Sequence, residues 1–352
     1  MTATLHVDLN AFANNLREVR AVVSPAEVML VVKDDAYGHG VTAVVRRAAK
    51  EGITWFGAFD VTTGRAVRAE LGNGVRIFVW MAASQADVAG IISEQLEVGI
   101  GDEALLEDVA QAAASARQVA RVHLKIDTGL HRNGIRPENW PGFVARAAEL
   151  QRSGSIEVIG VWSHIAEASD DEDDAARMIY DNALSQAAAA GLTIGVRHLA
   201  ASAASFARPE FRYDLVRVGA FCYGIRSAGG PSEKSLGLTV ASRLEAEVTA
   251  VDEHEVTVEV GSLDGLPSLL AGRVQVGTAN GSHELLRVGD TQSFVARWPD
   301  AGVGDTVRIY GPGDLQEASP TDLAEAINTI GEEIALRVSP LIPRMYSRGE
   351  KR

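Results

Sequence analysis

The chain has 352 residues, of which 46% are hydrophobic, enough for a large core and for two domains. Its formal net charge of −14 argues against nucleic acids and anionic membranes as partners, and its single cysteine excludes an internal disulfide and a thiolate metal cluster. The N-terminus does not resemble a signal peptide, and no apolar stretch reaches membrane-spanning length. We therefore expect a soluble cytoplasmic protein that binds no metal.

Strand-like and helix-like segments alternate through the first two thirds of the chain. Ala-rich amphipathic stretches predict helices over residues 41–49, 102–114, 140–152 and 174–190. Apolar runs predict strands over residues 26–33, 54–60, 76–80, 96–100, 121–127, 157–164, 196–200 and 215–224. Roughly eight β/α units result, the number in a (β/α)8 TIM-type barrel. An open, doubly wound sheet would show the same alternation, so the segments alone do not separate the two architectures.

The sequence changes character after residue 227. Short β-branched or alternating runs, separated by Asp, Gly and Asn, predict a mainly antiparallel β domain. These runs are 244–249, 255–261, 272–277, 292–298 and 306–310. One helix is expected over residues 321–328, with Thr321 or Ser319 as its N-cap. The segment 229–234 is the natural linker, so we predict a barrel over residues 1–228 and a C-terminal β domain over residues 229–352.

Residues 31–40, Val-Val-Lys-Asp-Asp-Ala-Tyr-Gly-His-Gly, form the most informative segment of the chain. The apolar run 28–32 ends at Lys33, so an amine is expected at the mouth of a sheet or barrel. A partly desolvated lysine amine is a nucleophile suited to Schiff-base chemistry with a carbonyl compound. A surface lysine at a strand end is the commoner alternative for any single lysine, so the interpretation depends on the other strand ends.

Other polar side chains also follow predicted strands, where a TIM barrel carries its chemistry. Each histidine taken alone is more commonly a satisfied, half-buried residue than a functional one. Taken together, the set combines a Schiff-base lysine with several cations and with Ser202 and Gly219, which suit an anion. A phosphate-bearing aldehyde cofactor requires such a ring of groups. The polar residues concerned are Lys33, Tyr37, Lys125, Asp127, Arg132, His164, His198, Ser202 and Arg217.

These segments resemble the motifs of the alanine racemases, a family of pyridoxal-phosphate enzymes. Residues 31–40 closely resemble the family's cofactor-lysine motif, and Lys125-Ile-Asp-Thr-Gly-Leu-His-Arg-Asn-Gly resembles its second signature. Three further segments resemble later signatures in the same order along the chain. They are Gly160-Val-Trp-Ser-His-Ile-Ala, His198-Leu-Ala-Ala-Ser-Ala-Ala and Tyr213-Asp-Leu-Val-Arg-Val-Gly. The resemblance covers almost the whole chain and is looser in residues 260–267 and 338–346.

The resemblance implies a role for each matching residue. Lys33 would hold pyridoxal phosphate as a Schiff base and act as one of the two acid/base groups at Cα of an amino-acid substrate. Arg217 would face the pyridine nitrogen and be braced by His198, while His164 would lie near the cofactor ring. Because a guanidinium keeps its proton, the cofactor would be a weak electron sink, which favours brief proton removal and return. The phosphate would be held by Tyr37, Ser202, Gly219 and Ala220.

Two further residues match positions near the substrate. The resemblance implies that Arg132 lies near the phenolate oxygen of the cofactor and the carboxylate of the substrate. Lys125 matches a lysine that is carbamylated in many members and that steadies this arginine. The family also builds each site from two subunits, so a homodimer with composite active sites is implied.

The match fails in the half of the site that the partner subunit contributes. The family carries a second catalytic tyrosine there, whereas residues 244–260 contain no tyrosine and the hairpin that carries it is missing. Partner-side segments around Ser262, Asp290 and Glu332 also depart from the family pattern, and Ala201 replaces an asparagine before Ser202. The barrel half is nearly intact, so we infer a functioning cofactor site whose second face has been remodelled.

Three functions remain open. The favoured one is an amino-acid racemase with a changed second base or pocket, for which His254 or Glu253 is a candidate substitute, although a solvated turn is the commoner role for both. The second is a one-base pyridoxal-phosphate enzyme that exchanges or eliminates at Cα without inversion. The third is a pyridoxal-phosphate-binding homologue without turnover. Exchange of the α-proton separates the third from the others, and inversion of configuration separates the first from the second.

Overall fold

The computed structural model describes residues 3–347. The chain forms two compact units, each built from several stretches of sequence. The barrel unit comprises residues 19–33 and 48–219, and the β-sheet unit comprises the described parts of residues 1–18, 34–47 and 220–352. Both units are discontinuous in sequence, and the domain boundary expected at residues 228–229 remains a prediction. Within residues 3–347, no helix is long and apolar enough to cross a membrane.

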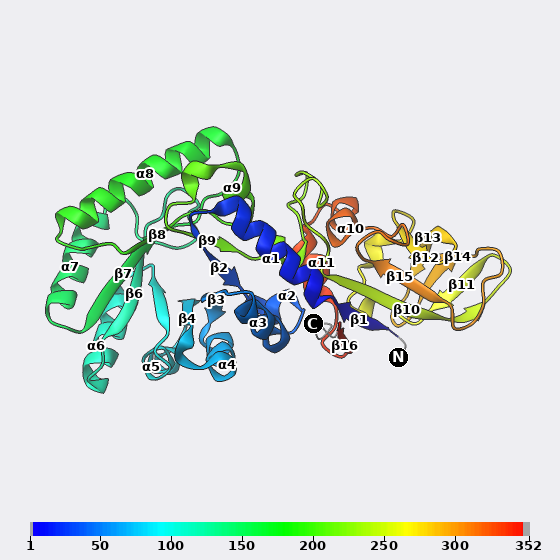
Figure 1. The fold of residues 1–352 in the computed structure, drawn as a ribbon, viewed down its shortest axis with the longest axis horizontal. Coiled ribbons are helices and arrows are strands. Elements are labelled where there is room, and N and C mark those ends of the chain that lie inside the picture. The colour runs from blue at the N-terminus through cyan, green and yellow to red at the C-terminus, as the bar shows by residue number, and fades with distance from the viewer. Residues whose placement is uncertain (1–2, 348–352) are drawn as a thin grey trace. The chain divides into compact units, whose positions relative to one another are not determined.

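The barrel unit contains a sheet of eight parallel strands, which confirms the predicted TIM-type fold (Figure 1). The strands lie in the order β8-β7-β6-β5-β4-β3-β2-β9. The outer two are joined by hydrogen bonds from the Asp214 amide to the Arg197 carbonyl, at 3.2 Å, and from the Arg217 amide to the Ala200 carbonyl, at 3.1 Å. The barrel therefore closes between β8 and β9. Its strands are β2 (Glu27–Val31), β3 (Trp55–Asp60), β4 (Arg76–Met81), β5 (Glu97–Ile100), β6 (Ala120–Lys125), β7 (Ile156–Trp162), β8 (Val196–His198) and β9 (Leu215–Val218).

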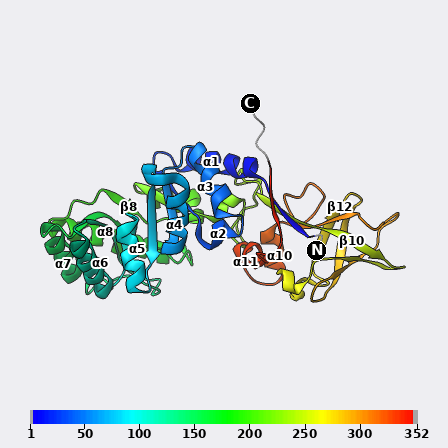
Figure 2. The same ribbon diagram turned by 90° about the horizontal axis from the view of Figure 1, so that it is seen from below.

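Several helices of the barrel unit begin where the sequence supplies an acceptor for their first free amides. The carboxylate of Asp60 accepts a hydrogen bond from the Thr63 amide at 2.7 Å, and Ser84, Asp102 and Ser169 act in the same way. Consecutive helices from α4 to α8 contact one another along the outside of the strands (Figures 1 and 2). The helices are α4 (Val61–Leu71), α5 (Gln85–Ser93), α6 (Glu103–Ala116), α7 (Trp140–Arg152), α8 (Asp170–Ala189) and α9 (Ser202–Ala207), with short 3-10 turns η1 (Gly72–Gly74) and η2 (Pro209–Phe211).

Large side chains fill the barrel interior. The ring of Trp162 on β7 lies 5.3 Å from that of Phe78 and 5.7 Å from that of His198, centroid to centroid. Gly99 on β5 makes this packing feasible, because a Cβ there would lie 2.8 Å from the Trp162 ring and 3.0 Å from Phe78. The same cluster includes Met29, Trp55 and Leu215. The barrel is thus a packed core, and its chemistry is expected at the ends of its strands.

The β-sheet unit contains a second eight-stranded sheet, in the order β11-β14-β13-β12-β15-β10-β1-β16. Its pairings are antiparallel, apart from the parallel pair β1–β16, so the predicted antiparallel β domain is confirmed. Three of its strands, β1, β13 and β16, were not predicted. The strands are β1 (Thr4–Val7), β10 (Ser242–Val251), β11 (Glu255–Val258), β12 (Gln275–Thr278), β13 (Gly281–Val288), β14 (Ser293–Ala296), β15 (Thr306–Tyr310) and β16 (Arg344–Tyr346).

Two short helices accompany this sheet. The first, α10 (Pro320–Ala326), begins after Ser319, whose hydroxyl accepts a hydrogen bond from the Asp322 amide at 3.2 Å. Ser319 is therefore the N-cap, and the alternative cap, Thr321, lies inside the helix. The second helix, α11 (Gly331–Arg337), was not predicted. The strand expected over residues 215–224 ends at Val218 and is followed by the 3-10 turn η3 (Ala220–Tyr223); two further 3-10 turns are η4 (Ser262–Asp264) and η5 (Ser268–Leu270).

The lysine segment adopts an uncommon backbone. It lies between α1 (Leu9–Val23) and α3 (Val41–Lys50), and Lys33 opens the short turn α2 (Lys33–Tyr37). Asp34 and Asp35 have φ of 53° and Ala36 has φ of 55°, a left-handed conformation that costs roughly 1–2 kcal/mol for each such residue. Gly40 follows with φ of +90°, and a Cβ there would overlap the hydroxyl of Tyr346. The segment that carries Lys33 is therefore held in one strained shape.

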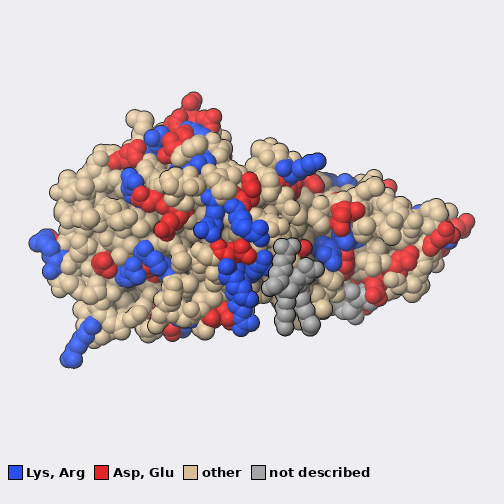
Figure 3. Space-filling view, in the orientation of Figure 1, with Lys and Arg blue, Asp and Glu red and all other residues tan. Residues whose placement is uncertain are grey.

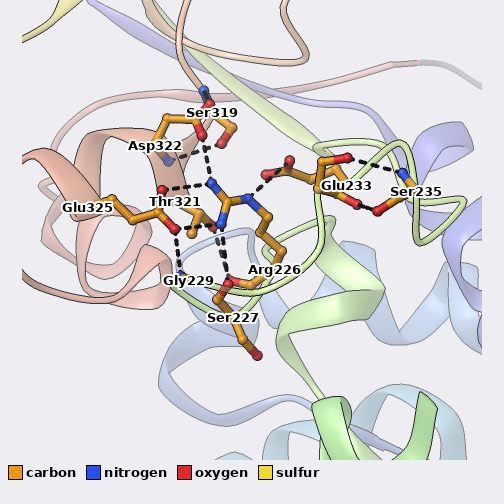
Figure 4. A network of polar contacts seen from close by, with 10 residues as sticks. Arg226, Ser227, Gly229, Glu233, Ser235, Ser319, Thr321, Asp322 and Glu325 are labelled. Atoms are coloured by element: carbon orange, nitrogen blue, oxygen red, sulfur yellow. Dashed lines mark hydrogen bonds and ion pairs between the residues drawn. The ribbon is translucent and has the colours of Figure 1, made fainter. Parts of the chain in front are cut away.

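Arg226 ties the expected linker to α10 within the β-sheet unit (Figure 4). Its guanidinium makes two bonds to the Glu325 carboxylate, at 2.6 and 2.9 Å, and one to Asp322, at 2.8 Å. It also pairs with Glu233 at 3.4 Å, and the Gly229 amide donates to Glu325 at 2.7 Å. The stretch that begins at Gly229 is thus anchored at two points.

Charged side chains of both signs are mixed on the face drawn in Figure 3, where Lys and Arg lie among Asp and Glu. The excess of negative charge is therefore not gathered into a single patch on that face. The charges that matter for function are those at the end of the barrel.

Candidate active site

The residues predicted to carry chemistry follow the C-terminal ends of barrel strands, the end at which TIM barrels have their active sites. Lys33 and His164 come two residues after β2 and β7 end, respectively. Lys125 and His198 are the last residues of β6 and β8. Arg217 lies within β9, Gly219 follows that strand, and Ser202 is the first residue of α9.

Arg217 is the centre of a hydrogen-bonded group. One terminal nitrogen, Nη1, donates to the His198 carbonyl at 2.9 Å and lies 3.2 Å from Nδ1 of the same residue. The other, Nη2, donates to the carbonyls of Ser163 and Leu199, at 2.7 and 3.0 Å, and lies 3.2 Å from Nδ1 of His164. Burial lowers the pKa of Arg217 to about 10, so the guanidinium keeps its proton at neutral pH. These bonds fix the plane of the group.

His164 is surrounded by positive charge. Burial, followed by the charges of Arg217, Arg132, Lys125 and Lys33, lowers its pKa to about 3. The imidazole is therefore neutral at physiological pH, and its Nδ1 accepts a hydrogen bond from Arg217. Four basic side chains from four separate loops or strands thus act on one ring.

Lys125 is buried beside two of these cations. Burial, followed by the charges of Arg217 and Arg132, lowers its pKa to about 8, against the opposing charge of Asp127. Its amine lies 4.4 Å from the centroid of the Trp162 ring, which is a cation–π distance when the amine is protonated. Near pH 8 a large fraction of the amine is neutral and therefore nucleophilic.

The loop that carries Arg132 is folded around Asp127. The Asp127 carboxylate accepts hydrogen bonds from the amides of Gly129 and His131, at 3.1 and 3.0 Å, and lies 3.0 Å from the His131 ring. Burial opposes its ionisation, but these bonds outweigh burial and lower the pKa of Asp127. Gly134 completes the loop, because its φ is +123° and a Cβ would lie 2.8 Å from the Asp127 nitrogen. Asp127 is thus a structural residue of the loop, and Arg132 itself is exposed.

The residues predicted to bind phosphate lie in both compact units. Within the barrel unit, the Gly219 amide donates to the Ser202 hydroxyl at 3.3 Å, so these two residues are neighbours. Tyr37 and Ala220 belong to the β-sheet unit, where the Tyr37 ring packs 4.9 Å from that of Tyr223 and Ala220 opens η3. The assembly of all four residues around one phosphate remains a prediction.

Comparison with known proteins identifies the family. Residues 7–227 match the model of the alanine racemase N-terminal domain. The chain belongs to the alanine racemase family. It is 36% identical to an alanine racemase from Beutenbergia cavernae over an alignment 378 positions long, gaps included, that covers 97% of each protein, and 33% identical to one from Thermobifida fusca over 98% of each. The crystal structure of alanine racemase from D-cycloserine-producing Streptomyces lavendulae is similar with a TM-score of 0.93 at 31% identity, over 99% of this chain and 98% of that one.

The alanine racemase family depends on pyridoxal phosphate, and the barrel end fits such an anionic cofactor. Arg217 lies 3.2 Å from His164, and the charges of Arg217, Arg132, Lys125 and Lys33 all lower the pKa of that histidine, so four basic groups act on this end of the barrel. In addition, the indole nitrogen of Trp162 is buried without a hydrogen-bond acceptor among residues 3–347. A site rich in cations and donors suits a ligand that carries phosphate and carboxylate oxygens.

Two buried polar residues of this racemase-family barrel were not among the predicted site residues. Glu97 is 1% exposed and His123 is fully buried, and both are hydrogen-bonded inside the barrel. Each interrupts an apolar run that was interpreted only as a strand. A charged or polar side chain in a run buried on both faces must find a partner, and this signal was available in the sequence.

Proposed function

We propose that this chain is a pyridoxal-phosphate-dependent amino-acid racemase of the alanine racemase type, acting in the cytoplasm as a homodimer with composite sites. The observation that carries the proposal is the group of four basic side chains around His164, of which Lys33 follows a strand end and carries the nucleophilic amine. Membership of the alanine racemase family supports it independently.

Each residue has a proposed task. Lys33 would link covalently to the cofactor's aldehyde and, once released, move a proton at Cα. Arg217 would bind the pyridine nitrogen, braced by His198, with His164 beside the ring. Arg132 would orient the substrate carboxylate. The phosphate would be bound by Tyr37, Ser202, Gly219 and Ala220, which together offer two hydroxyls and two amides.

Pyridoxal phosphate, when bound, supplies a carbonyl for the substrate amine and a sink for the electron pair left at Cα. Arg217 limits that sink. Its pKa of about 10, lowered by burial, still keeps it protonated at neutral pH, so it would donate a hydrogen bond to the pyridine nitrogen without giving up the proton. With so weak a sink, negative charge at Cα would persist only briefly, which would favour immediate return of a proton over transamination. This property supports racemisation as the reaction.

The opposite face supports a second candidate, a one-base enzyme that exchanges the Cα proton without inversion. Between residues 224 and 345 the chain has one tyrosine, Tyr310, and its side chain is 1% exposed. The hairpin between β10 and β11 is closed by the exposed residues Asp252, Glu253 and His254, with the Asp252 amide donating to the Glu255 carbonyl at 2.8 Å. No tyrosine is therefore available there as the second base, and Glu253 or His254 would have to replace it.

The deciding experiment incubates the protein and pyridoxal phosphate with L-alanine and a panel of other L-amino acids in deuterated water. The α-proton and the enantiomer ratio are then followed together. Exchange with inversion is expected for a racemase, and the panel identifies its substrate. Exchange with retention would favour the one-base enzyme. Absence of exchange across the panel, with the cofactor bound, would overturn both and leave a pyridoxal-phosphate-binding protein without turnover.

A further inference from the structure

A chain of buried side chains crosses the barrel interior and ends at Arg217. Oε2 of Glu97 lies 2.8 Å from Nε2 of His123, and Nδ1 of His123 lies 3.0 Å from Nε2 of His198. Nδ1 of His198 in turn lies 3.2 Å from Nη1 of Arg217. The four residues belong to β5, β6, β8 and β9, and none is more than 5% exposed. The chain therefore connects the first residue of β5 with the site at the opposite end of the barrel.

Two arginines hold the far end of this chain in place. Oε1 of Glu97 lies 2.6 Å from Nε of Arg76 and 3.1 Å from Nη1 of Arg121. Its other oxygen, Oε2, lies 2.9 Å from Nη2 of Arg76. Both arginines line a pocket of about 460 Å³ at the N-terminal ends of β4, β5 and β6. Burial opposes the ionisation of Glu97, but the hydrogen bonds from His123 and Arg76 outweigh it and lower its pKa to about 2. Glu97 is thus a carboxylate at every physiological pH.

An ionised Glu97 permits one arrangement of protons along the chain. A carboxylate only accepts hydrogen bonds, so His123 must donate from Nε2 and keep Nδ1 bare. His198 must then donate from Nε2 to that lone pair, and its own bare Nδ1 accepts from Arg217. Burial lowers the pKa of both histidines, so each ring is neutral and carries a single proton. In the reverse arrangement, Nδ1–H of His198 would face an N–H of Arg217.

We propose that Glu97 and His123 are positioning residues that fix the proton arrangement of His198 and, through it, the orientation of the Arg217 guanidinium. Their effect on catalysis rests on the proposed function, in which Arg217 binds the pyridine nitrogen. The proton arrangement itself does not depend on that function and is measurable on the protein without cofactor.

Glu97→Gln is the variant that reverses the direction of the hydrogen bonds between these buried side chains. The Oε1 position faces nitrogens from two arginines and the Oε2 position faces one, so the amide oxygen is expected at Oε1. The amide NH2 group then takes the Oε2 position, where it faces His123. His123 must then accept at Nε2 and carry its proton on Nδ1. His198 follows, and its Nδ1–H opposes Arg217. The substitution keeps the size of the side chain but removes its charge as well as changing its hydrogen-bond polarity, so a control that removes another buried carboxylate is needed.

The first readout is the two-bond proton–nitrogen spectrum of protein labelled in its histidine rings, assigned with His123→Gln. The wild-type protein is expected to carry Nε2–H on both His123 and His198, and an Nδ1–H on either ring would overturn the proposal without any Glu97 variant. Glu97→Gln is expected to move both protons to Nδ1. An unchanged spectrum would mean that Glu97 does not set the proton positions of the two histidines.

The second readout is the rate of Cα deuterium exchange, which is expected to fall roughly 10–100-fold in Glu97→Gln because a displaced guanidinium misaligns the cofactor. Glu317→Gln is the matched control, since Glu317 is a buried carboxylate paired with Arg308 at 3.0 Å in the β-sheet unit. It is expected to lower thermal stability while leaving ring spectra and exchange unchanged. Loss of exchange in Glu97→Gln with a wild-type ring spectrum would overturn the positioning role. Absence of exchange in the wild-type protein would instead overturn the proposed function, and the spectra would still test the chain.

Discussion

The amine of Lys125 lies 4.4 Å from the centroid of the Trp162 ring, on an apolar surface and close to two arginines. Burial and the charges of Arg217 and Arg132 lower the pKa of Lys125 to about 8, so the neutral amine predominates above that pH. A neutral amine adds to carbon dioxide, forming a carbamate and releasing one proton, and the new negative charge would lie beside those arginines. We predict that protein incubated with ¹³C-bicarbonate shows a carbamate carbon signal whose intensity rises as the pH rises through 8.

Lys125→Arg tests the assignment of that signal, because it keeps the positive charge but cannot form the carbamate. The signal should disappear in this variant and persist in Lys50→Arg, which changes an exposed lysine of α3. A signal that survives in Lys125→Arg would assign the carbamate to another amine.

Lys33→Ala should abolish covalent retention of pyridoxal phosphate. The wild-type protein, incubated with the cofactor and reduced with borohydride, is expected to gain the mass of one reduced cofactor and to lose its near-visible absorbance. Lys33→Ala should show neither property, because its side chain has no amine. Lys50→Ala serves as the control and should behave as the wild-type protein does. A cofactor adduct that persists in Lys33→Ala would refute the assignment.

Arg217→Glu should divert the reaction toward transamination. A carboxylate accepts a hydrogen bond from a protonated pyridine nitrogen, so the substitution strengthens the electron sink. Pyridoxamine phosphate formed per turnover, measured chromatographically, is expected to rise relative to the wild-type protein. Arg217→Lys keeps the positive charge and should show no such rise. Equal amounts of pyridoxamine phosphate in both variants would argue against contact between residue 217 and the ring nitrogen.

The strand ends were predictable from the sequence, whereas the contacts across the barrel were not. Lys33 and His164 each follow an apolar run, and runs of that length predict strands whose ends carry function. Glu97 and His123 lie within such runs, and their partners are separated in sequence, so periodicity does not reveal the bond between them. The strand β1, residues 4–7, was not predicted for the same reason, because it pairs with β10 and β16, which lie far away along the chain.

Arg226→Met should destabilise the β-sheet unit. The arginine is buried and satisfies the carboxylates of Glu325, Asp322 and Glu233 (Figure 4), which lose their partner in the variant. The expected loss in the free energy of unfolding is about 2–4 kcal/mol, below the upper range for a fully buried pair because two of the carboxylates are partly exposed. Urea unfolding measures it. Arg146→Met breaks an exposed pair with Glu107 and should leave the midpoint almost unchanged.

Gly40→Ala should strain the lysine segment in two separable ways. Its φ of +90° is unfavourable for any residue with a Cβ, at a cost of roughly 1–2 kcal/mol. The new methyl group also overlaps the hydroxyl of Tyr346, and we expect this to add about 1 kcal/mol, the low end for overpacking, because that side chain is 38% exposed and can shift. Gly191→Ala isolates the backbone cost, since Gly191 has φ of +88° and no atom within 4 Å of a Cβ.

The steric part of this cost is measured by a double-mutant cycle with Tyr346→Phe, which removes the overlapping hydroxyl. Gly40→Ala should destabilise the Tyr346→Phe protein about as much as Gly191→Ala destabilises the wild-type protein. The difference between the two backgrounds is then the coupling energy between residues 40 and 346. A coupling energy of zero would mean that the backbone conformation alone demands glycine at position 40.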